Sequence, residues 1–397
     1  MDSALRDPPA RNSAAPAARH RDGGARAQTA FLDEMRGLAA LAVCLYHVGT
    51  YTGAAQLMPN GYLAVDFFFM LSGFVLAEAY GDRLGHDAPA DRRMALGDFV
   101  RRRLIRMAPI VVLGAGLGSA YLIARWFVAP DRSDRLGEVL LGSALNLVLV
   151  PKVWVGAATR GELFPSDGPL WSLFFELLAN FAWAASLVRR STAAIGVGVF
   201  ACALVLIAVA ARHGSMNLGW ELKSIDGGLA RIGFGFAMGL LLHRLRHRLP
   251  AMGARHAALA AGALLFAMAL PVREVAWTMF VAIVLMPAVL ALSISAGRHH
   301  AIPGGRWLGR ISYPLYGIHV PLLTLYAGAT EYLGHGESGT GASALLPFAM
   351  VPAALVVAAW LTTAWEEPTR AALTRRFGSA TVRCRSRIDA VGETRPN

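Results

Sequence analysis

Apolar segments close to twenty residues long recur along the whole chain, and this feature constrains its fold more than any other. A helix of that length crosses about 30 Å of hydrocarbon, where every backbone polar group must find a partner within the protein. We therefore expect an all-α polytopic membrane protein with about ten transmembrane helices around a central polar cavity. The expected spans are residues 37–56, 61–80, 107–128, 169–188, 193–211, 225–243, 256–272, 275–293, 311–330 and 344–364.

The distribution of charge orients these spans. Of 397 residues 55% are apolar and 16% are charged, which excludes an ordinary soluble protein. A net charge of +12 is typical of nucleic-acid binders, but Lys and Arg also collect in the cytoplasmic loops of membrane proteins. With the N-terminus inside, 29 of the 38 Lys and Arg residues fall in inner segments, 8 in outer segments and Arg231 in a span. This asymmetry predicts cytoplasmic termini and no nucleic-acid partner.

Composition divides the chain into three regions. Residues 1–28 are rich in Ala, Arg, Pro and Gly without an apolar stretch, so we expect a disordered cytoplasmic tail rather than a signal peptide. Residues 29–370 hold the spans, and residues 371–397 form a basic cytoplasmic tail. The apolar stretch 137–150 is short, and counting it as a span would reverse every later loop, so we interpret it as interfacial or re-entrant. The Ala and Arg usage favours a bacterial inner membrane.

Polar side chains inside hydrocarbon are costly and usually face a cavity lined by protein. Arg36 and His47 are eleven residues apart, which in a helix is a rise of about 16 Å and a rotation of about 1100°, or three turns and about 20°. Both therefore lie on one face, with His47 near mid-membrane. Other spans contribute further polar groups at intramembrane depth, namely Asp66, Ser72, Glu176 and His319.

Each of these groups also has an ordinary structural explanation. A histidine in a helix bundle is as often a hydrogen-bonding bridge between helices as a catalyst, and Ser72 is small enough to permit close helix packing. Asp66 and Glu176 are candidates for a buried ion pair with Arg231. The three cysteines are far apart, so we expect no disulfide and no metal site. The pattern alone leaves both readings open.

A run of arginines precedes the third expected span. Any inner loop collects arginine through the orientation rule, which is the ordinary explanation of the run. Arg103 and Arg106 are three residues apart and share a helical face, where two guanidinium groups suit bidentate capture of phosphate oxygens. The spacing therefore suits a phosphorylated donor that enters from the cytoplasm.

Six sequence pieces follow one another in a characteristic order between residues 31 and 370. They read FLDEMRGLAALAVCLYHVG, GYLAVDFFFMLSGFVL, RRLIRMAP, LWSLFFELL, ISYPLYGIHVP and EEPTR. Together they resemble the integral membrane acyltransferases known as acyltransferase type 3, whose members O-acylate cell-surface polysaccharides, lipid-linked sugars and some small molecules. The resemblance implies that Arg36 and His47 are central to transfer and that Arg103 and Arg106 help to bind the donor.

The implied activity is transfer of an acyl group, expected to be acetyl, from cytoplasmic acyl-CoA to a hydroxyl of a carbohydrate-type acceptor such as a polysaccharide or lipid-linked sugar. No bound cofactor is expected, because acyl-CoA is a substrate. A neutral imidazole titrates near working pH and suits His47 as general base, while an acyl-enzyme relay through His47 or Ser72 stays open. We assign His47, Arg36, Glu176 and Asp66 to catalysis, Arg36, Arg103, Arg106 and Ser72 to donor binding, and Trp171, Arg231, Tyr313 and His319 to the acceptor site or cavity lining.

An exporter of a glycan or small metabolite is the alternative from another class, because a substrate pathway also places polar groups at mid-membrane. It predicts internal repeats or helices broken at matching positions, and the sequence shows neither. A membrane subunit without catalysis leaves the spacing of Arg36 and His47 unexplained.

Overall fold

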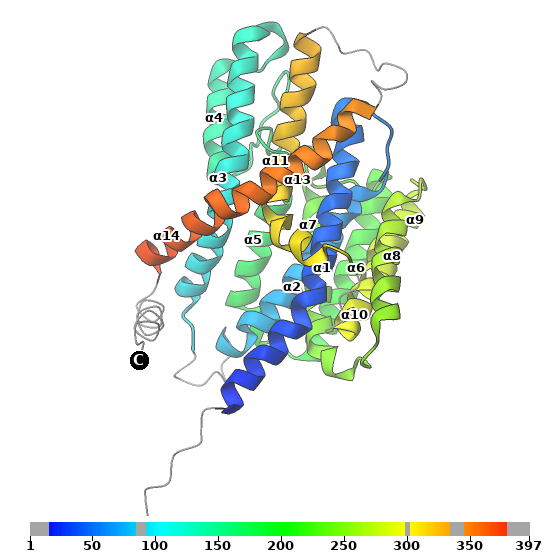
Figure 1. The fold of residues 1–397 in the computed structure, drawn as a ribbon. Coiled ribbons are helices and arrows are strands. Elements are labelled where there is room, and N and C mark those ends of the chain that lie inside the picture. The colour runs from blue at the N-terminus through cyan, green and yellow to red at the C-terminus, as the bar shows by residue number, and fades with distance from the viewer. Residues whose placement is uncertain (1–15, 85–92, 298–301, 334–344, 379–397) are drawn as a thin grey trace, which may run out of the picture.

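The computed structural model describes residues 16–84, 93–297, 302–333 and 345–378. The longer helices are α1 (Pro16–Thr52), α2 (Ala64–Leu84), α3 (Leu96–Val128), α4 (Leu136–Leu147), α5 (Leu170–Ala185), α6 (Thr192–His213), α7 (Ile225–Leu245), α8 (Ala254–Ala269), α9 (Val275–Phe280), α10 (Met286–Ala296), α11 (Gly305–Tyr332), α13 (Met350–Leu361) and α14 (Glu367–Phe377). Short 3₁₀ segments are Gly61–Leu63, Pro130–Arg132, Leu187–Arg189, Leu222–Ser224, Arg246–Arg248 and Leu346–Ala349, and π-helical turns are Val281–Leu285 and Thr362–Glu366. Within the described residues β-pairing is limited to two isolated bridges, so the expected all-α class is confirmed (Figure 1).

Six helical segments are long and apolar enough to cross a membrane, as expected of a multi-pass membrane protein. They are Gly61–Leu84, Leu96–Val128, Thr192–His213, Leu222–Arg248, Val275–Ala296 and Leu346–Phe377. Each of them coincides with one expected span. The outward side chains Val197, Phe200 and Leu204 of α6 are 71%, 67% and 52% exposed, which suits contact with lipid.

The other four expected spans also fall on helices, namely α1, α5, α8 and α11. α5 and α8 have 16 residues each, about 24 Å of helix, which is shorter than the hydrocarbon layer of a bilayer. The count of ten spans therefore stays a prediction. The expected interfacial or re-entrant piece is α4, a helix of 12 residues that packs against α3.

The segments expected as tails are described only in part. Residues 1–15 and 379–397 lie outside the described residues. Helix α1 begins at Pro16, inside the segment expected to be disordered, and α14 continues to Phe377, inside the expected C-terminal tail.

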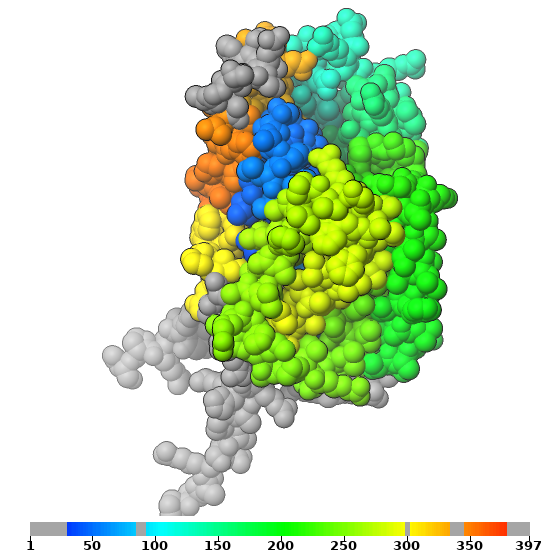
Figure 2. Space-filling model, turned by 90° about the vertical axis from the view of Figure 1, so that its right-hand side faces the viewer, coloured from blue at the N-terminus to red at the C-terminus, as the bar shows by residue number. Residues whose placement is uncertain are grey.

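α1 and α11 lie side by side with backbones in contact. A Cβ atom on Gly37 would lie 2.6 Å from the backbone nitrogen of Gly309, and one on Gly309 would lie 2.4 Å from the carbonyl oxygen of Asp33. Small residues of this kind let membrane helices approach closely. Figure 2 shows the neighbouring face, where α8, α9 and α10 (yellow-green to yellow) cover part of α1 (blue).

α2 and α7 approach each other in the same way. A Cβ atom on Gly73 would lie 2.3 Å from the carbonyl oxygen of Phe236, and one on Gly239 would lie 2.0 Å from that of Met70. The two close pairs, α1 with α11 and α2 with α7, fix which side chains of these helices face one another.

The segment between α4 and α5 has an ordered path although most of it is neither helix nor strand. Lys152 is 1% exposed, and its ammonium group donates to the carbonyl oxygen of Arg160 at 3.0 Å. The buried side-chain oxygen of Asn146 accepts from the backbone N–H of Ser166 at 3.2 Å. These contacts hold the segment against the bundle and fix the position of Glu162 within it.

Candidate active site

A pair of histidines from α1 and α11 lies at the centre of the site. Nδ1 of His47 is 2.9 Å from Nε2 of His319, and Nδ1 of His319 is 3.0 Å from the carbonyl oxygen of Leu315. That carbonyl accepts only from a protonated Nδ1, so Nε2 of neutral His319 carries a lone pair and accepts from Nδ1–H of His47. Neutral His47 is thereby left with its own lone pair on Nε2, the atom that a general base uses.

His47 lines a cavity of about 290 Å³, called here the His47 cavity. Its polar and aromatic lining is Tyr46, His47, Thr50, Tyr51, Tyr62, Glu162, Trp171, Asn217, Trp220, Arg231 and Tyr316. Glu162 lies in the segment before α5, outside the helices, and burial raises the pKa of Glu162 to about 7.

Arg231 and Asp66 form a fully buried ion pair beside this cavity. Nε and Nη2 of Arg231 donate to the two carboxylate oxygens of Asp66 at 3.0 and 2.8 Å, and the guanidinium lies 5.2 Å from the Trp171 ring centroid. Its remaining bonds go to the carbonyl oxygens of Leu218 and Tyr62. Asp66 does not line the cavity. The geometry therefore favours the structural explanation of this pair, a buried ion pair that holds the helices together.

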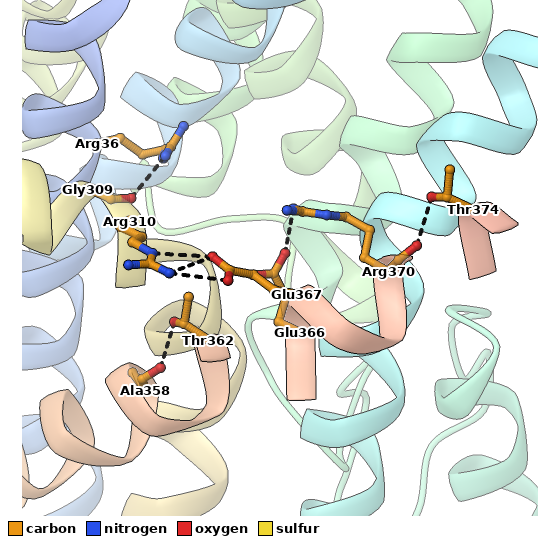
Figure 3. Close-up of polar contacts among 9 residues, drawn as sticks. All are labelled: Arg36, Gly309, Arg310, Ala358, Thr362, Glu366, Glu367, Arg370 and Thr374. Atoms are coloured by element: carbon orange, nitrogen blue, oxygen red, sulfur yellow. Dashed lines mark hydrogen bonds and ion pairs between the residues drawn. The ribbon is translucent and has the colours of Figure 1, made fainter. Parts of the chain in front are cut away.

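A second cavity, of about 200 Å³, lies toward the N-terminal part of α1 and is called the Arg36 cavity. Its polar lining is Arg36, Ser72, Tyr80, Arg103, Arg106, Ser172, Glu176, Ser312, Tyr313 and Tyr316. The Arg36 guanidinium is held by Asp33 at 2.8 Å, by Ser312 at 3.0 Å and by the carbonyl oxygen of Gly309 at 3.0 Å, the last contact being drawn in Figure 3.

Glu176 lies in the Arg36 cavity and not beside His47. Its Oε1 accepts from Nη2 of Arg103 at 2.9 Å and from the Ser72 hydroxyl at 2.8 Å. The sequence assigns Glu176 and Asp66 to catalysis, but in the structure the side-chain partner of the His47 imidazole is His319. Glu176 instead neutralises one of the arginines expected to bind the donor.

Two groups of the Arg36 cavity have free bonding capacity. The Tyr313 hydroxyl is buried and has no hydrogen-bond partner among the described residues. The Arg106 guanidinium lies 6.0 Å from the centroid of that tyrosine ring. A ligand with phosphate or carbonyl oxygens fits these donors.

A smaller pocket of about 120 Å³ adjoins the Arg36 cavity and shares Tyr80 and Arg106 with it. Arg101, Arg102 and Arg370 also line it, so it is strongly basic. α14 supplies Arg370, and Figure 3 shows how α14 is attached. Arg370 pairs with Glu366 at 2.7 Å, and Glu367 accepts from Arg310 of α11 at 3.0 Å.

The two large cavities meet at Tyr316, which alone among the described residues lines both. The structure thus has two cavities where we expected one central cavity, and that expectation is not confirmed. The assigned residues divide between them. Arg36, Ser72, Arg103, Arg106, Glu176 and Tyr313 line the Arg36 cavity, and His47, Trp171 and Arg231 line the His47 cavity, with His319 directly behind His47.

Sequence reasoning missed several residues that the fold brings into the site. Tyr316 and Ser172 lie inside the recognised pieces, one helical turn before His319 and next to Trp171, so their positions carried a usable signal. Glu162 and Trp220 lie in connecting segments without apolar periodicity, where no pattern in a single sequence indicates which helix they will face.

The sequence model of the acyltransferase domain matches residues 29–364, and the chain therefore belongs to this acyltransferase family. It is a membrane protein and a transferase that moves acyl groups.

Three relatives show the range of the match. "Protein 2 in picA locus" of Rhizobium radiobacter is 35% identical over 45% of this chain and 93% of its own length. The putative peptidoglycan O-acetyltransferase YrhL of Bacillus subtilis is 26% identical over 76% of this chain and 49% of its own length. The exopolysaccharide production protein ExoZ of Rhizobium meliloti is 27% identical over 76% of this chain and 88% of its own length. No solved structure matches the chain significantly.

Proposed function

We propose that this protein transfers an acyl group, acetyl in the simplest case, from cytoplasmic acyl-CoA to a hydroxyl of a carbohydrate acceptor. The observation that carries the proposal is the pairing of two unlike cavities, one rich in arginine and one containing an imidazole base among aromatic rings. We place the protein in a bacterial inner membrane with both termini in the cytoplasm, in line with its basic inner segments.

The Arg36 cavity and the basic pocket suit the donor. Coenzyme A carries several phosphate charges, which guanidinium groups bind through charge-assisted, often bidentate hydrogen bonds. Arg102 and Arg106 would hold the nucleotide end near the inner surface. The pantetheine arm would then extend past Arg36, whose position along α1 is about 16 Å from His47.

The His47 cavity suits a sugar. Its aromatic residues, among them Trp171 and Trp220, offer apolar ring faces, while Asn217 and Glu162 offer hydrogen-bond donors and acceptors for hydroxyl groups. The names of YrhL and ExoZ connect those relatives with peptidoglycan and exopolysaccharide, which supports a glycan acceptor and an ester product here.

The chemistry follows from the tautomer of His47. Nε2 of His47 takes the proton of the acceptor hydroxyl while the hydroxyl oxygen attacks the thioester carbonyl carbon. A C–O bond forms and the C–S bond of the thioester breaks. The leaving thiolate of coenzyme A then takes that proton from the imidazolium. Throughout, Nδ1–H of His47 donates to His319, which keeps the ring in position.

Purified protein given radiolabelled acetyl-CoA and extracted envelope glycans tests the proposal. We expect the glycan to become labelled and His47→Ala to abolish the labelling, while Arg132→Ala, a change in an exposed pair with Glu331, serves as the matched control. Unchanged labelling by His47→Ala defeats the proposed role, and movement of glycan across vesicles without acylation favours the exporter.

A further inference from the structure

His47 and the arginines Arg36, Arg103 and Arg106 lie in different cavities, and Tyr316 lines both of these cavities. The Tyr316 hydroxyl is 2.6 Å from the hydroxyl of Ser172, to which it donates while Ser172 donates to Pro169, and it lies 3.3 Å from the carbonyl oxygen of Pro169. Tyr316 is 6% exposed, and its ring forms a T-shaped contact with Phe68 at 5.6 Å and lies beside His319 at 5.8 Å, measured between centroids. The ring therefore stands between the Arg36 cavity and the histidine pair.

This position conflicts with transfer in the conformation observed. Reacting atoms must approach to about 3–3.5 Å, so a thioester in the Arg36 cavity and a sugar hydroxyl at His47 need a shared space. Tyr316 occupies the place where the two cavities would join.

We infer that Tyr316 is a gate, whose ring swings aside to join the two cavities and whose closed position keeps the donor thioester away from the His47 cavity. The role given to this gate rests on the proposed function, but the movement of the Tyr316 ring can be tested without it. Tyr316 is thus a positioning residue that decides when the thioester meets the base.

The hydrogen bonds of the closed position allow such a movement. The Ser172 hydroxyl also donates to the carbonyl oxygen of Pro169 at 3.0 Å, so it keeps a partner when Tyr316 leaves. The departing tyrosine hydroxyl needs one new acceptor, and an entering thioester carbonyl provides it. Opening on donor entry therefore leaves neither of these two hydroxyls unpaired, which would otherwise be costly.

Cysteine accessibility tests the gate without relying on catalysis. In a variant without its own cysteines, Thr50→Cys lies in the His47 cavity and Ala79→Cys in the Arg36 cavity. A small, membrane-impermeant methanethiosulfonate is applied to vesicles from the face on which α1 begins. We expect labelling of Ala79→Cys only, and we expect Tyr316→Ala to bring labelling of Thr50→Cys close to the rate of Ala79→Cys.

Several outcomes would overturn the inference. Equal labelling of Thr50→Cys with Tyr316 intact means that no barrier exists, and no gain in Tyr316→Ala means that another group forms it. As a control for folding, Thr50→Cys should be labelled from the opposite face at the same rate with Tyr316 intact and in Tyr316→Ala. If the alanine variant does not accumulate, Tyr316→Val replaces it.

A second measurement ties the gate to the proposed reaction. With acetyl-CoA and no acceptor, Tyr316→Ala should release free coenzyme A severalfold faster than the unaltered protein, because water in the His47 cavity reaches the thioester and yields acetate and the thiol. If Tyr316→Ala increases labelling of Thr50→Cys but releases no coenzyme A from acetyl-CoA, the donor assignment is wrong and the gate is still supported. Accelerated release without any gain in labelling defeats the gate.

Discussion

Nδ1 of His47 lies 2.9 Å from Nε2 of His319, and the two rings come from helices whose backbones touch at Gly37 and Gly309. Because the other nitrogen of His319 faces the carbonyl oxygen of Leu315, the direction of the hydrogen bond between the rings is determined. His319 therefore holds the tautomer of His47 that the proposed reaction requires.

Replacing His319 should lower turnover without weakening substrate binding. His319→Ala removes the acceptor for Nδ1–H of His47, and we expect a loss of about 10–100-fold, as for the partners that orient metal-bound histidines. We expect kcat to fall by that order while KM for donor and acceptor stays the same. His319→Gln places an amide oxygen near the same position and should restore part of the rate. Equal losses in both variants, or a change confined to KM, would argue for packing alone.

Acceptor binding should depend on pH through Glu162. Burial raises the pKa of Glu162 to about 7, with Lys152 lowering it and Glu221 raising it further. Below that pH the group is protonated, and a carboxylate accepts hydrogen bonds from sugar hydroxyls more strongly than the neutral acid. We expect KM for the acceptor to fall as the pH rises through about 7. Initial rates across this range measure it, and Glu162→Gln should remove the dependence; a flat profile in the unaltered protein speaks against the assignment.

The ion pair of Arg231 with Asp66 should matter for stability. Both side chains are almost completely buried, at 0% and 3% exposure, and removing one partner of a buried pair typically costs about 3–5 kcal/mol. We expect Arg231→Met to lower the thermal unfolding temperature in detergent strongly, and the double variant with Asp66→Leu to recover much of the loss. Arg132→Ala, in a pair that is 70% and 65% exposed, should change stability by less than about 1 kcal/mol. A single variant as stable as the control is incompatible with this account.

Arg106 should recognise the phosphates of the donor. It lines both the Arg36 cavity and the basic pocket, and a hydrogen bond to a charged group is worth about 1.5–3 kcal/mol. Arg106→Ala should therefore raise KM for acetyl-CoA by about tenfold or more. KM for acetyl-pantetheine, which lacks the nucleotide phosphates, should not change. Arg132→Ala is the matched control, since Arg132 forms an exposed pair with Glu331 and lines none of these cavities. An equal rise for both donors places the effect elsewhere.

Helical periodicity predicted that Arg36 and His47 share one face of α1, because this depends only on the geometry of one helix, and in the structure both side chains contact α11. It left the partners of Asp66 and Glu176 open, and the structure gives Asp66 to Arg231 and Glu176 to Arg103. Those choices depend on which helices are neighbours, and hydropathy does not contain that information. The pairing of His47 with His319 was inaccessible for the same reason.

Helix boundaries show a second limit. The third span was expected from residue 107, where the arginines end, but α3 begins at Leu96. Hydropathy marks the part of a helix that suits lipid, while the backbone continues its hydrogen bonds through Arg101 and Arg106 into the polar region. These added turns bring the arginines to the Arg36 cavity and the basic pocket.

Transfer between compartments tests the central claim most directly. Vesicles containing the protein are filled with an oligosaccharide of N-acetylglucosamine, and radiolabelled acetyl-CoA is added outside, to the face on which α1 begins. We predict labelled oligosaccharide inside the vesicles, and none with His47→Ala. Labelling only when the oligosaccharide is added on the same side as acetyl-CoA would contradict a donor cavity and an acceptor cavity that meet at Tyr316 and lie toward opposite ends of α1.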